Sequence, residues 1–196
     1  MTSRADEELA ALIERARAGD DRAFEELARR EERALYRHAA RMLGSGPDAE
    51  DVVQDAFLSA WRGIRSFEGT SFRAWVFRIV TNRALDLIRS KRRRPELPLE
   101  PAADEDVVWA EPAAPDADLS EIASGREALV VVEEALKGVP EEQRAALLLR
   151  DVEGFAYEEI ALMTNAEIGT VKSRIHRARV AVRNALVIRG WRGSGG

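Results

Sequence analysis

The sequence predicts an all-α protein with two small helical domains joined by an acidic, proline-rich linker. Three observations lead to this prediction. Apolar side chains recur with helical spacing on both sides of the middle of the chain. No run of strict apolar–polar alternation is long enough to predict a strand. Between the helical stretches, residues 95–124 contain five of the seven prolines, nine acids and no base, a composition typical of an extended, self-repelling linker.

The N-terminal half is predicted to form the first domain, residues 1–94. Asp20, after Gly19, is expected to cap the second helix. Pro47 is expected near the start of the third helix, because proline suits the first helical turn. The loop over residues 67–71 is expected to precede the fourth helix. The predicted helices are at about 6–18, 21–43, 48–64 and 71–92.

The C-terminal half is predicted to form the second domain, residues 121–190. It follows a flexible linker over residues 95–120 and precedes a tail, residues 191–196, that we expect to be disordered. Pro140 is expected to open the second helix of this domain, and Asn165 suits the turn before the last helix, because asparagine tolerates left-handed backbone angles. The predicted helices are at about 121–137, 140–152, 156–163 and 168–189.

The composition excludes several classes of protein. The chain has 196 residues, of which 45% are hydrophobic and 33% are charged, as in a soluble globular protein. It has no cysteine, and its two histidines, His38 and His176, cannot build a zinc site alone. We therefore expect no cofactor and no metal. No apolar run approaches the roughly 20 residues needed to cross a bilayer, and the start has no hydrophobic signal core. We expect a cytoplasmic protein without membrane insertion.

The net charge of −5 is unevenly distributed along the chain. Residues 1–94 carry 19 bases and 16 acids, residues 95–124 carry no base and nine acids, and residues 125–196 carry 11 bases and 10 acids. The acidity therefore lies in the linker, and each domain remains free to bind nucleic acid. Two roles stay open for the linker: a solvated spacer, or a segment that occupies a basic nucleic-acid channel until RNA displaces it.

The last predicted helix is basic and free of acids. Residues 169–192 hold seven Lys or Arg and no Asp or Glu. At about 100° per residue, one face carries apolar side chains and the other carries polar and basic ones. With the preceding helix it has the layout of a helix-turn-helix, whose second helix enters the major groove. The alternative is an ordinary charged surface helix, but such helices usually carry i,i+4 ion pairs. The apolar face comprises Val171, Ile175, Ala178, Val182 and Leu186, and the polar face comprises Lys172, Ser173, His176, Arg177, Arg179 and Arg183.

A second basic region runs from Arg62 to Arg94, with ten bases against two acids, and six of the twelve aromatic residues lie between positions 57 and 77. Bases interleaved with aromatic rings suit single-stranded DNA. The alternative is that the rings are core, which we favour for Phe57, Phe72 and Phe77. Phe67 lies in a loop and is expected outside the core. On the helix from Ser71, the predicted core stripe is Phe72, Val76, Ile79, Val80 and Leu87, and the opposite basic face holds Arg78, Asn82, Arg89 and Arg93.

A third feature is acidic. Asp48 and Glu50 lie in a predicted first helical turn, where acids stabilise the helix dipole whatever else they do. For these two residues a structural and a functional role both stay open. Asp51, Gln54 and Asp55 continue beyond the first turn beside exposed apolar groups such as Leu58, which indicates a protein-docking surface.

Together these segments resemble the extracytoplasmic-function sigma factors of bacterial RNA polymerase. Residues 48–57 (DAEDVVQDAF) resemble the family's core-binding helix, and residues 71–82 (SFRAWVFRIVTN) resemble its promoter-melting helix. The C-terminal domain of the family is resembled by residues 147–154, 157–161 and 169–174. The resemblance covers roughly residues 20–94 and 121–187. The order and spacing of the motifs are more specific than any one of them.

The resemblance implies three functional surfaces and no catalytic residue. The partners implied are core RNA polymerase, through the clamp helices of its largest subunits and its flap, promoter DNA in double- and single-stranded form, and an anti-sigma factor. The implied minus-10 residues are Phe67, Arg78, Ile79, Asn82 and Arg89. The implied minus-35 residues are Thr170, Lys172, Ser173, Arg174, His176 and Arg177. The implied polymerase-binding residues are Asp51, Gln54, Asp55 and Leu58.

The chain departs from the family pattern at two places. Many relatives carry Ser or Thr where this chain has Ala156, so a helix cap that contributes about 1 kcal/mol is expected to be missing. Glu158 and Glu159 are expected to compensate partly through the helix dipole. Thr164 and Asn165 stand where a Leu-Gly pair is common, at the turn before the last helix.

Two other functions fit the sequence less well. A self-sufficient helix-turn-helix regulator with a sensor domain would explain the last helix, but not the aromatic-basic helix or the acidic docking helix. An enzyme is disfavoured, because the sequence shows no nucleophile–base pair, phosphate loop or metal cluster. We therefore expect a dissociable promoter-specificity subunit that leaves the chemistry to the polymerase.

Overall fold

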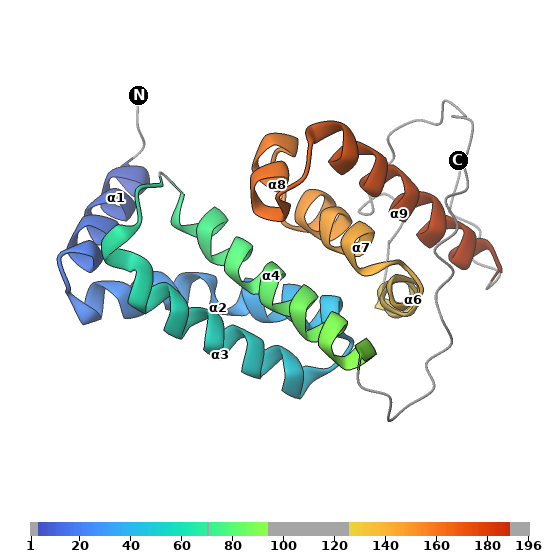
Figure 1. The fold of residues 1–196 in the computed structure, drawn as a ribbon, viewed down its shortest axis with the longest axis horizontal. Helices are drawn as coiled ribbons and strands as arrows, with labels where there is room; N and C mark the ends of the chain where they lie inside the picture. The colour runs from blue at the N-terminus through green and yellow to red at the C-terminus, as the bar shows by residue number, and fades with distance from the viewer. Residues whose placement is uncertain (1–3, 70, 94–125, 189–196) are drawn as a thin grey trace. The chain divides into compact units, whose positions relative to one another are not determined.

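The computed structural model describes residues 4–69, 71–93 and 126–188 (Figure 1), which are helical and contain no strand. They divide into two compact units, one built mainly from the N-terminal helices and the other mainly from the C-terminal helices. The prediction of an all-α fold is confirmed. The predicted linker and tail lie outside the described residues. None of the helices described is long and apolar enough to span a bilayer.

The N-terminal unit follows the predicted helices closely. Asp20 caps the second helix, because its Oδ1 accepts from the backbone N–H groups of Arg22 and Ala23 at 3.0 and 3.2 Å. Ser71 caps the fourth helix in the same way, accepting from the N–H of Ala74 at 3.1 Å. Pro47 stands in the first turn of the third helix, as expected. The elements are α1 (Arg4–Arg17), α2 (Asp21–Leu43), α3 (Gly46–Gly63), the 3-10 turn η1 (Ile64–Ser66) and α4 (Phe72–Arg93).

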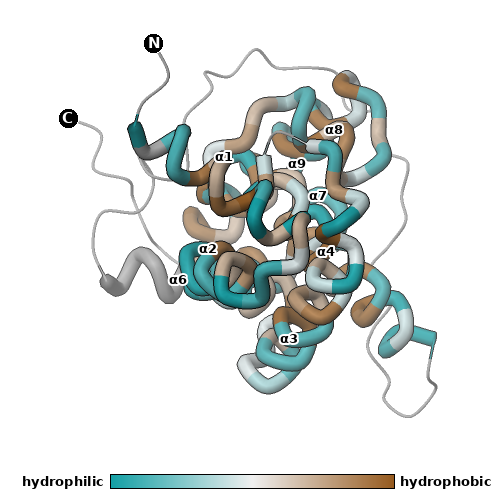
Figure 2. Tube along the Cα trace, turned by 90° about the vertical axis from the view of Figure 1, so that its left-hand side faces the viewer, coloured by the Kyte–Doolittle hydropathy of each residue, from teal (hydrophilic) through white to brown (hydrophobic). Residues whose placement is uncertain are grey.

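The core of this unit is formed by the inner faces of its helices. Figure 2 shows polar and apolar residues alternating along the turns of α2 and α3, and these two helices pack against each other. The ring of Phe24 meets Trp61 and Phe72 edge-on, with centroids 5.1 and 6.2 Å apart. Phe72 and Phe77 are buried, which confirms that these two rings belong to the core rather than to a surface for DNA bases.

His38 is a buried polar residue of this core. Its Nε2 lies 3.0 Å from the hydroxyl of Thr81, which joins α2 to α4, and its ring meets Phe77 edge-on at 5.4 Å. Burial lowers the pKa of His38 from its ordinary value of 6.5 to about 3, assisted by the positive charges of Arg41 and Arg73. His38 is therefore neutral in the folded protein at neutral pH.

The C-terminal unit is organised around the last helix. The apolar face predicted for it is confirmed, because all five of its residues are buried. This helix packs against α6 and α7. The elements are α6 (Arg126–Lys137), α7 (Glu141–Leu147), the π-helical turn η2 (Leu148–Val152), α8 (Tyr157–Thr164) and α9 (Ile168–Ile188).

The predicted helix at 140–152 differs from the structure in its second half. It begins after Pro140 as expected, but from Leu148 it widens into the π-helical turn η2. The backbone N–H of Glu153 donates to the carbonyl of Leu148 at 3.0 Å, a five-residue spacing. Leu148 and Leu149 are both buried in this wider turn. Arg150 and Asp151 are the next two residues of the same turn. Such an extra residue leaves no signature in a 3.6-residue apolar period.

The turn of the helix-turn-helix segment and the start of its first helix lie where the sequence predicts them. Asn165 has a φ of 50°, the left-handed conformation expected of it. At the start of α8, the backbone N–H of Ala156 donates to Glu159 Oε2 at 2.8 Å. This bond is one half of a capping box. Glu159 therefore compensates for the missing Ser or Thr by a direct hydrogen bond.

Candidate nucleic-acid and protein interfaces

The outer face of α9 carries the predicted DNA-binding residues. Thr170, Lys172, Ser173, His176 and Arg177 are all exposed. The hydroxyl of Ser173 donates to the carbonyl of Thr170 at 2.9 Å, so its oxygen lone pairs remain available as acceptors. A row of donors, acceptors and cations therefore stands on a helix whose opposite face is anchored in the core.

Two arginines of α9 are bound within their own unit. Arg179 was expected on the open polar face, and this is wrong. Its Nε and Nη2 donate to the two carboxylate oxygens of Asp151 at 2.9 and 2.8 Å, and the side chains are 12% and 1% exposed. Arg174 forms an ion pair with Glu142 of α7 and is 23% exposed. Both acids come from other elements, so the composition of α9 alone could not reveal these pairs.

Tyr157, the first residue of α8, lies against two cations. The guanidinium carbon of Arg150 is 4.6 Å from the centre of its ring, and the ammonium of Lys172 is 5.6 Å from it. Arg150 also donates from Nη1 to the carbonyl of Phe155 at 2.9 Å. Sequence reasoning used Tyr157 only as part of a family motif and missed this contact.

The basic face of α4 is exposed where it was predicted. Arg78, Asn82 and Arg89 are exposed, and Ile79 is half-buried at the edge of the core. Arg73, on the same helix, has a structural role. It pairs with Glu31 at 2.9 Å, and its guanidinium carbon lies 4.6 Å from the centre of the Phe77 ring.

Phe67 does not stand outside the core, and that expectation is wrong. It is 6% exposed and stacks on Trp75, with centroids 4.8 Å apart and planes 29° apart. Its backbone N–H closes η1 by donating to the carbonyl of Ile64 at 3.1 Å. Gly69 crosses so close to the ring that a Cβ atom there would lie 2.7 Å from it. The loop therefore folds Phe67 onto α4, with Trp75 as its partner.

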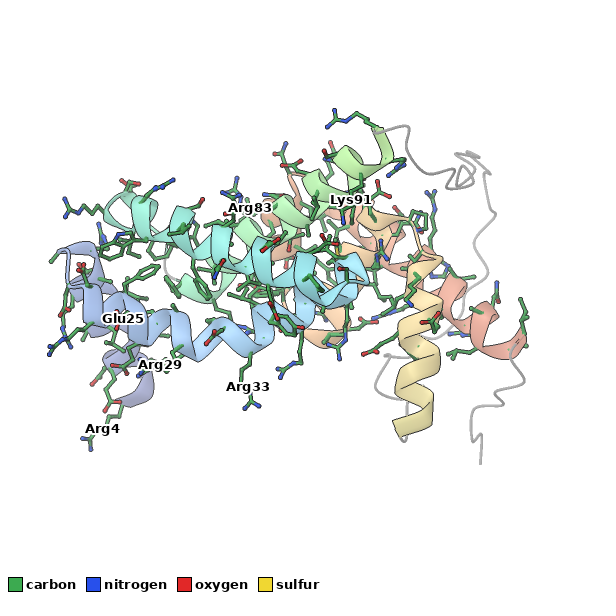
Figure 3. The ribbon with its side chains drawn as sticks, turned by 90° about the horizontal axis from the view of Figure 1, so that it is seen from below. Arg4, Glu25, Arg29, Arg33, Arg83 and Lys91 are labelled. Carbon is green, nitrogen blue, oxygen red and sulfur yellow. The ribbon has the colours of Figure 1, made fainter. Side chains whose placement is uncertain are left out.

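The acidic surface of α3 is exposed as predicted. Asp51, Gln54 and Asp55 are exposed, and Leu58 is 52% exposed beside them. Arg83 of α4 extends toward α3 (Figure 3) and donates to the carboxylate of Asp55 at 3.2 Å and to the hydroxyl of Ser59 at 2.5 Å. Sequence reasoning missed Arg83, which holds one carboxylate of the surface in place.

These features define a helix-turn-helix DNA-binding protein with a second helical unit that bears its own basic and acidic faces. The models of sigma-70 region 2 and sigma-70 region 4 match residues 27–94 and 129–182. The chain is 39% identical over 183 residues to the ECF RNA polymerase sigma-E factor of Escherichia coli K12, covering 89% of this chain and 92% of that protein. The RNA polymerase sigma-H factor of Pseudomonas aeruginosa is 36% identical over 177 residues, with the same coverage. The chain belongs to the extracytoplasmic-function (ECF) sigma factors.

Two solved structures have similar folds. The sigma factor RpoE of Bartonella quintana, in complex with the anti-sigma factor NepR, is 31% identical with a TM-score of 0.63, over 84% of this chain and 97% of that one. CnrH, in complex with the cytosolic domain of CnrY, is 29% identical with a TM-score of 0.64, over 91% of this chain and 96% of that one.

Proposed function

We propose that this chain is a promoter-specificity subunit, which binds core RNA polymerase, recognises the minus-35 and minus-10 elements and helps to open the duplex. The exposed, acid-free face of α9 carries this proposal, together with membership of the ECF sigma factors. The chain contributes no catalytic residue, since the polymerase performs the chemistry. Because it acts on the polymerase, it works in the cytoplasm.

The minus-35 element is assigned to α9. Its N-terminal half presents Thr170, Lys172, Ser173, His176 and Arg177, and the N-terminal residues of a recognition helix are those that contact base edges. Arg174 belongs to the same surface. One of its terminal nitrogens already donates to Glu142, so we expect a smaller loss from its removal than from that of Arg177.

The minus-10 element is assigned to α4 and the loop before it. Arg78 and Arg89 supply positive charge, Ile79 supplies an apolar edge, and Asn82 supplies both a donor and an acceptor for a base. Phe67 is buried in the free protein, so its proposed role is to form a wall of the base pocket with Trp75, or to become exposed when the loop moves. Contacts made only to the single strand offset the unstacking cost of a few kcal/mol per flipped base.

The polymerase clamp helices are assigned to α3, through Asp51, Gln54, Asp55 and Leu58. Carboxylates beside an exposed leucine are complementary to a partner surface that has basic residues beside an apolar centre. Contact of the C-terminal unit with the polymerase flap is part of the same proposal. The sigma factor RpoE of Bartonella quintana was solved in complex with the anti-sigma factor NepR, and we propose that an anti-sigma factor also restrains this chain.

Gel filtration of the purified full chain with core RNA polymerase tests the proposal, followed by run-off transcription from a library of genomic fragments. We expect co-elution and a set of start sites that share two spaced elements. Asp51→Lys should reduce co-elution. Glu25→Lys, the same charge reversal on the exposed part of α2 (Figure 3), serves as the matched control.

The opposite result would identify a stand-alone regulator. In that case the chain would elute apart from core polymerase and would bind a specific duplex equally well without it.

A further inference from the structure

Lys172 stands on the proposed DNA-reading face, and an aromatic ring lies beside its ammonium group. Its ammonium lies 5.6 Å from the centre of the Tyr157 ring. Over residues 4–69, 71–93 and 126–188, no carboxylate pairs with it. The negative face of an aromatic ring attracts a cation held beside it.

The Tyr157 ring is itself held from outside α9. The guanidinium of Arg150 lies 4.6 Å from the ring centre, and Arg150 is fixed by its hydrogen bond to the carbonyl of Phe155. Arg150 belongs to the π-helical turn η2, and the next residue, Asp151, binds Arg179 on α9. Consecutive residues of one turn therefore hold the ring and the recognition helix in a common frame.

A lysine side chain with no neighbour to restrict it loses conformational entropy when it binds. Its flexible four-carbon stem samples many rotamers, and the entropy lost when DNA fixes the stem weakens the contact. A ring fixed beside the ammonium restricts the stem before DNA arrives, and a side chain ordered in advance loses less entropy on binding.

We propose that Tyr157 is a positioning residue that pre-orders Lys172 for its contact with the minus-35 element. The inference rests on the proposed function, since it assumes that Lys172 contacts DNA. The ring carries the effect, and the hydroxyl of Tyr157 has no part in it. Tyr157 thereby adds to the affinity of the reading face through a neighbouring residue.

A double-mutant cycle on holoenzyme binding to a mapped minus-35 duplex tests this. Tyr157→Leu should weaken binding about three- to fivefold in the wild-type background, the range of a cation–π contact at an exposed site. In the Lys172→Ala background the same change should have almost no effect, because the residue it positions is gone. Tyr157→Phe keeps the ring and should bind as the wild type does. Thermal unfolding of each variant reports any structural loss separately.

Four outcomes would overturn the inference. Equal losses from Tyr157→Leu in both backgrounds would make the ring a structural residue only. A loss with Tyr157→Phe would assign the effect to the hydroxyl. No loss with Tyr157→Leu would remove the ring from recognition. If Lys172→Ala alone binds as the wild type does, the assignment of Lys172 to the reading face fails as well, which separates an error in the proposed function from an error in the positioning role.

Discussion

The buried ion pair between Asp151 and Arg179 supports the sharpest prediction about stability. Both carboxylate oxygens of Asp151 are used, and its side chain is 1% exposed. Removing one partner of a buried pair leaves the other charge without compensation, which costs about 3–5 kcal/mol. Asp151→Ala should therefore lower the stability of the C-terminal unit by about that amount. This is a large share of the roughly 5–15 kcal/mol that a small domain has in total.

Hydrogen exchange of the α9 amides in the full chain measures the loss of stability locally. Urea unfolding, monitored by circular dichroism, measures it for the whole chain. The cycle Asp151→Ala, Arg179→Met and the double variant should give a double loss well below the sum of the single losses, since the second removal also removes the stranded charge. Arg183→Ala is the matched control: Arg183 is exposed on the same helix, and its loss should stay within about 0.5 kcal/mol. If Asp151→Ala costs as little as Arg183→Ala, the pair does not hold α9 in place.

Four further predictions concern pH, the polymerase and DNA. The folded pKa of His38, about 3, is below its unfolded value of 6.5, so the unfolded state binds the proton first and stability falls as pH drops from 6.5 toward 3. Because of His38, the free energy of unfolding measured in urea should fall by about 2 kcal/mol between pH 7 and pH 5. The variant His38→Gln should lose this pH dependence, and an unchanged pH profile in that variant would contradict a neutral buried ring. Asp51→Lys should weaken core binding by a few kcal/mol in a pull-down with helical content intact, whereas equal loss with Glu25→Lys would point to general electrostatics. Arg177→Ala should weaken minus-35 binding by about 1–3 kcal/mol, and a promoter panel distinguishes a base contact, lost at one position, from a phosphate contact, lost for all sequences with a flatter salt slope. Phe67→Ala should reduce the permanganate reactivity of the minus-10 region, and a template already mismatched there should restore it if the ring helps to extract a base. If promoter opening by Phe67→Ala equals that of the wild type, Phe67 has a role in the core and none in opening.

Local signals in the sequence were sufficient for most of the helices and for the buried face of α9. The apolar face of α9 follows from the 3.6-residue period, Asn165 from its tolerance of left-handed angles, and the cap of α2 from Asp20. Leu58 and the acids before it are exposed as the pattern of α3 predicts.

The errors arose where a side chain has a partner on another element of the fold. Arg179 carries the same charge as its exposed neighbours, and only the fold brings Asp151 to it. Phe67 lies in a loop by sequence, but its partner Trp75 lies on the following helix. In both cases the local pattern describes the segment that bears the residue, and it does not show which side chain of another segment lies against it.

The π-helical turn has a consequence for insertions and deletions. Removing one residue from Leu148–Val152 would let the segment continue as a regular α-helix. Each residue beyond the deletion would then rotate by about 100°. Ordinary loops between helices absorb such changes in length, but here the ring contact of Arg150 and the ion pair of Asp151 both depend on one extra residue. This short segment should therefore tolerate side-chain substitution more readily than any change in length.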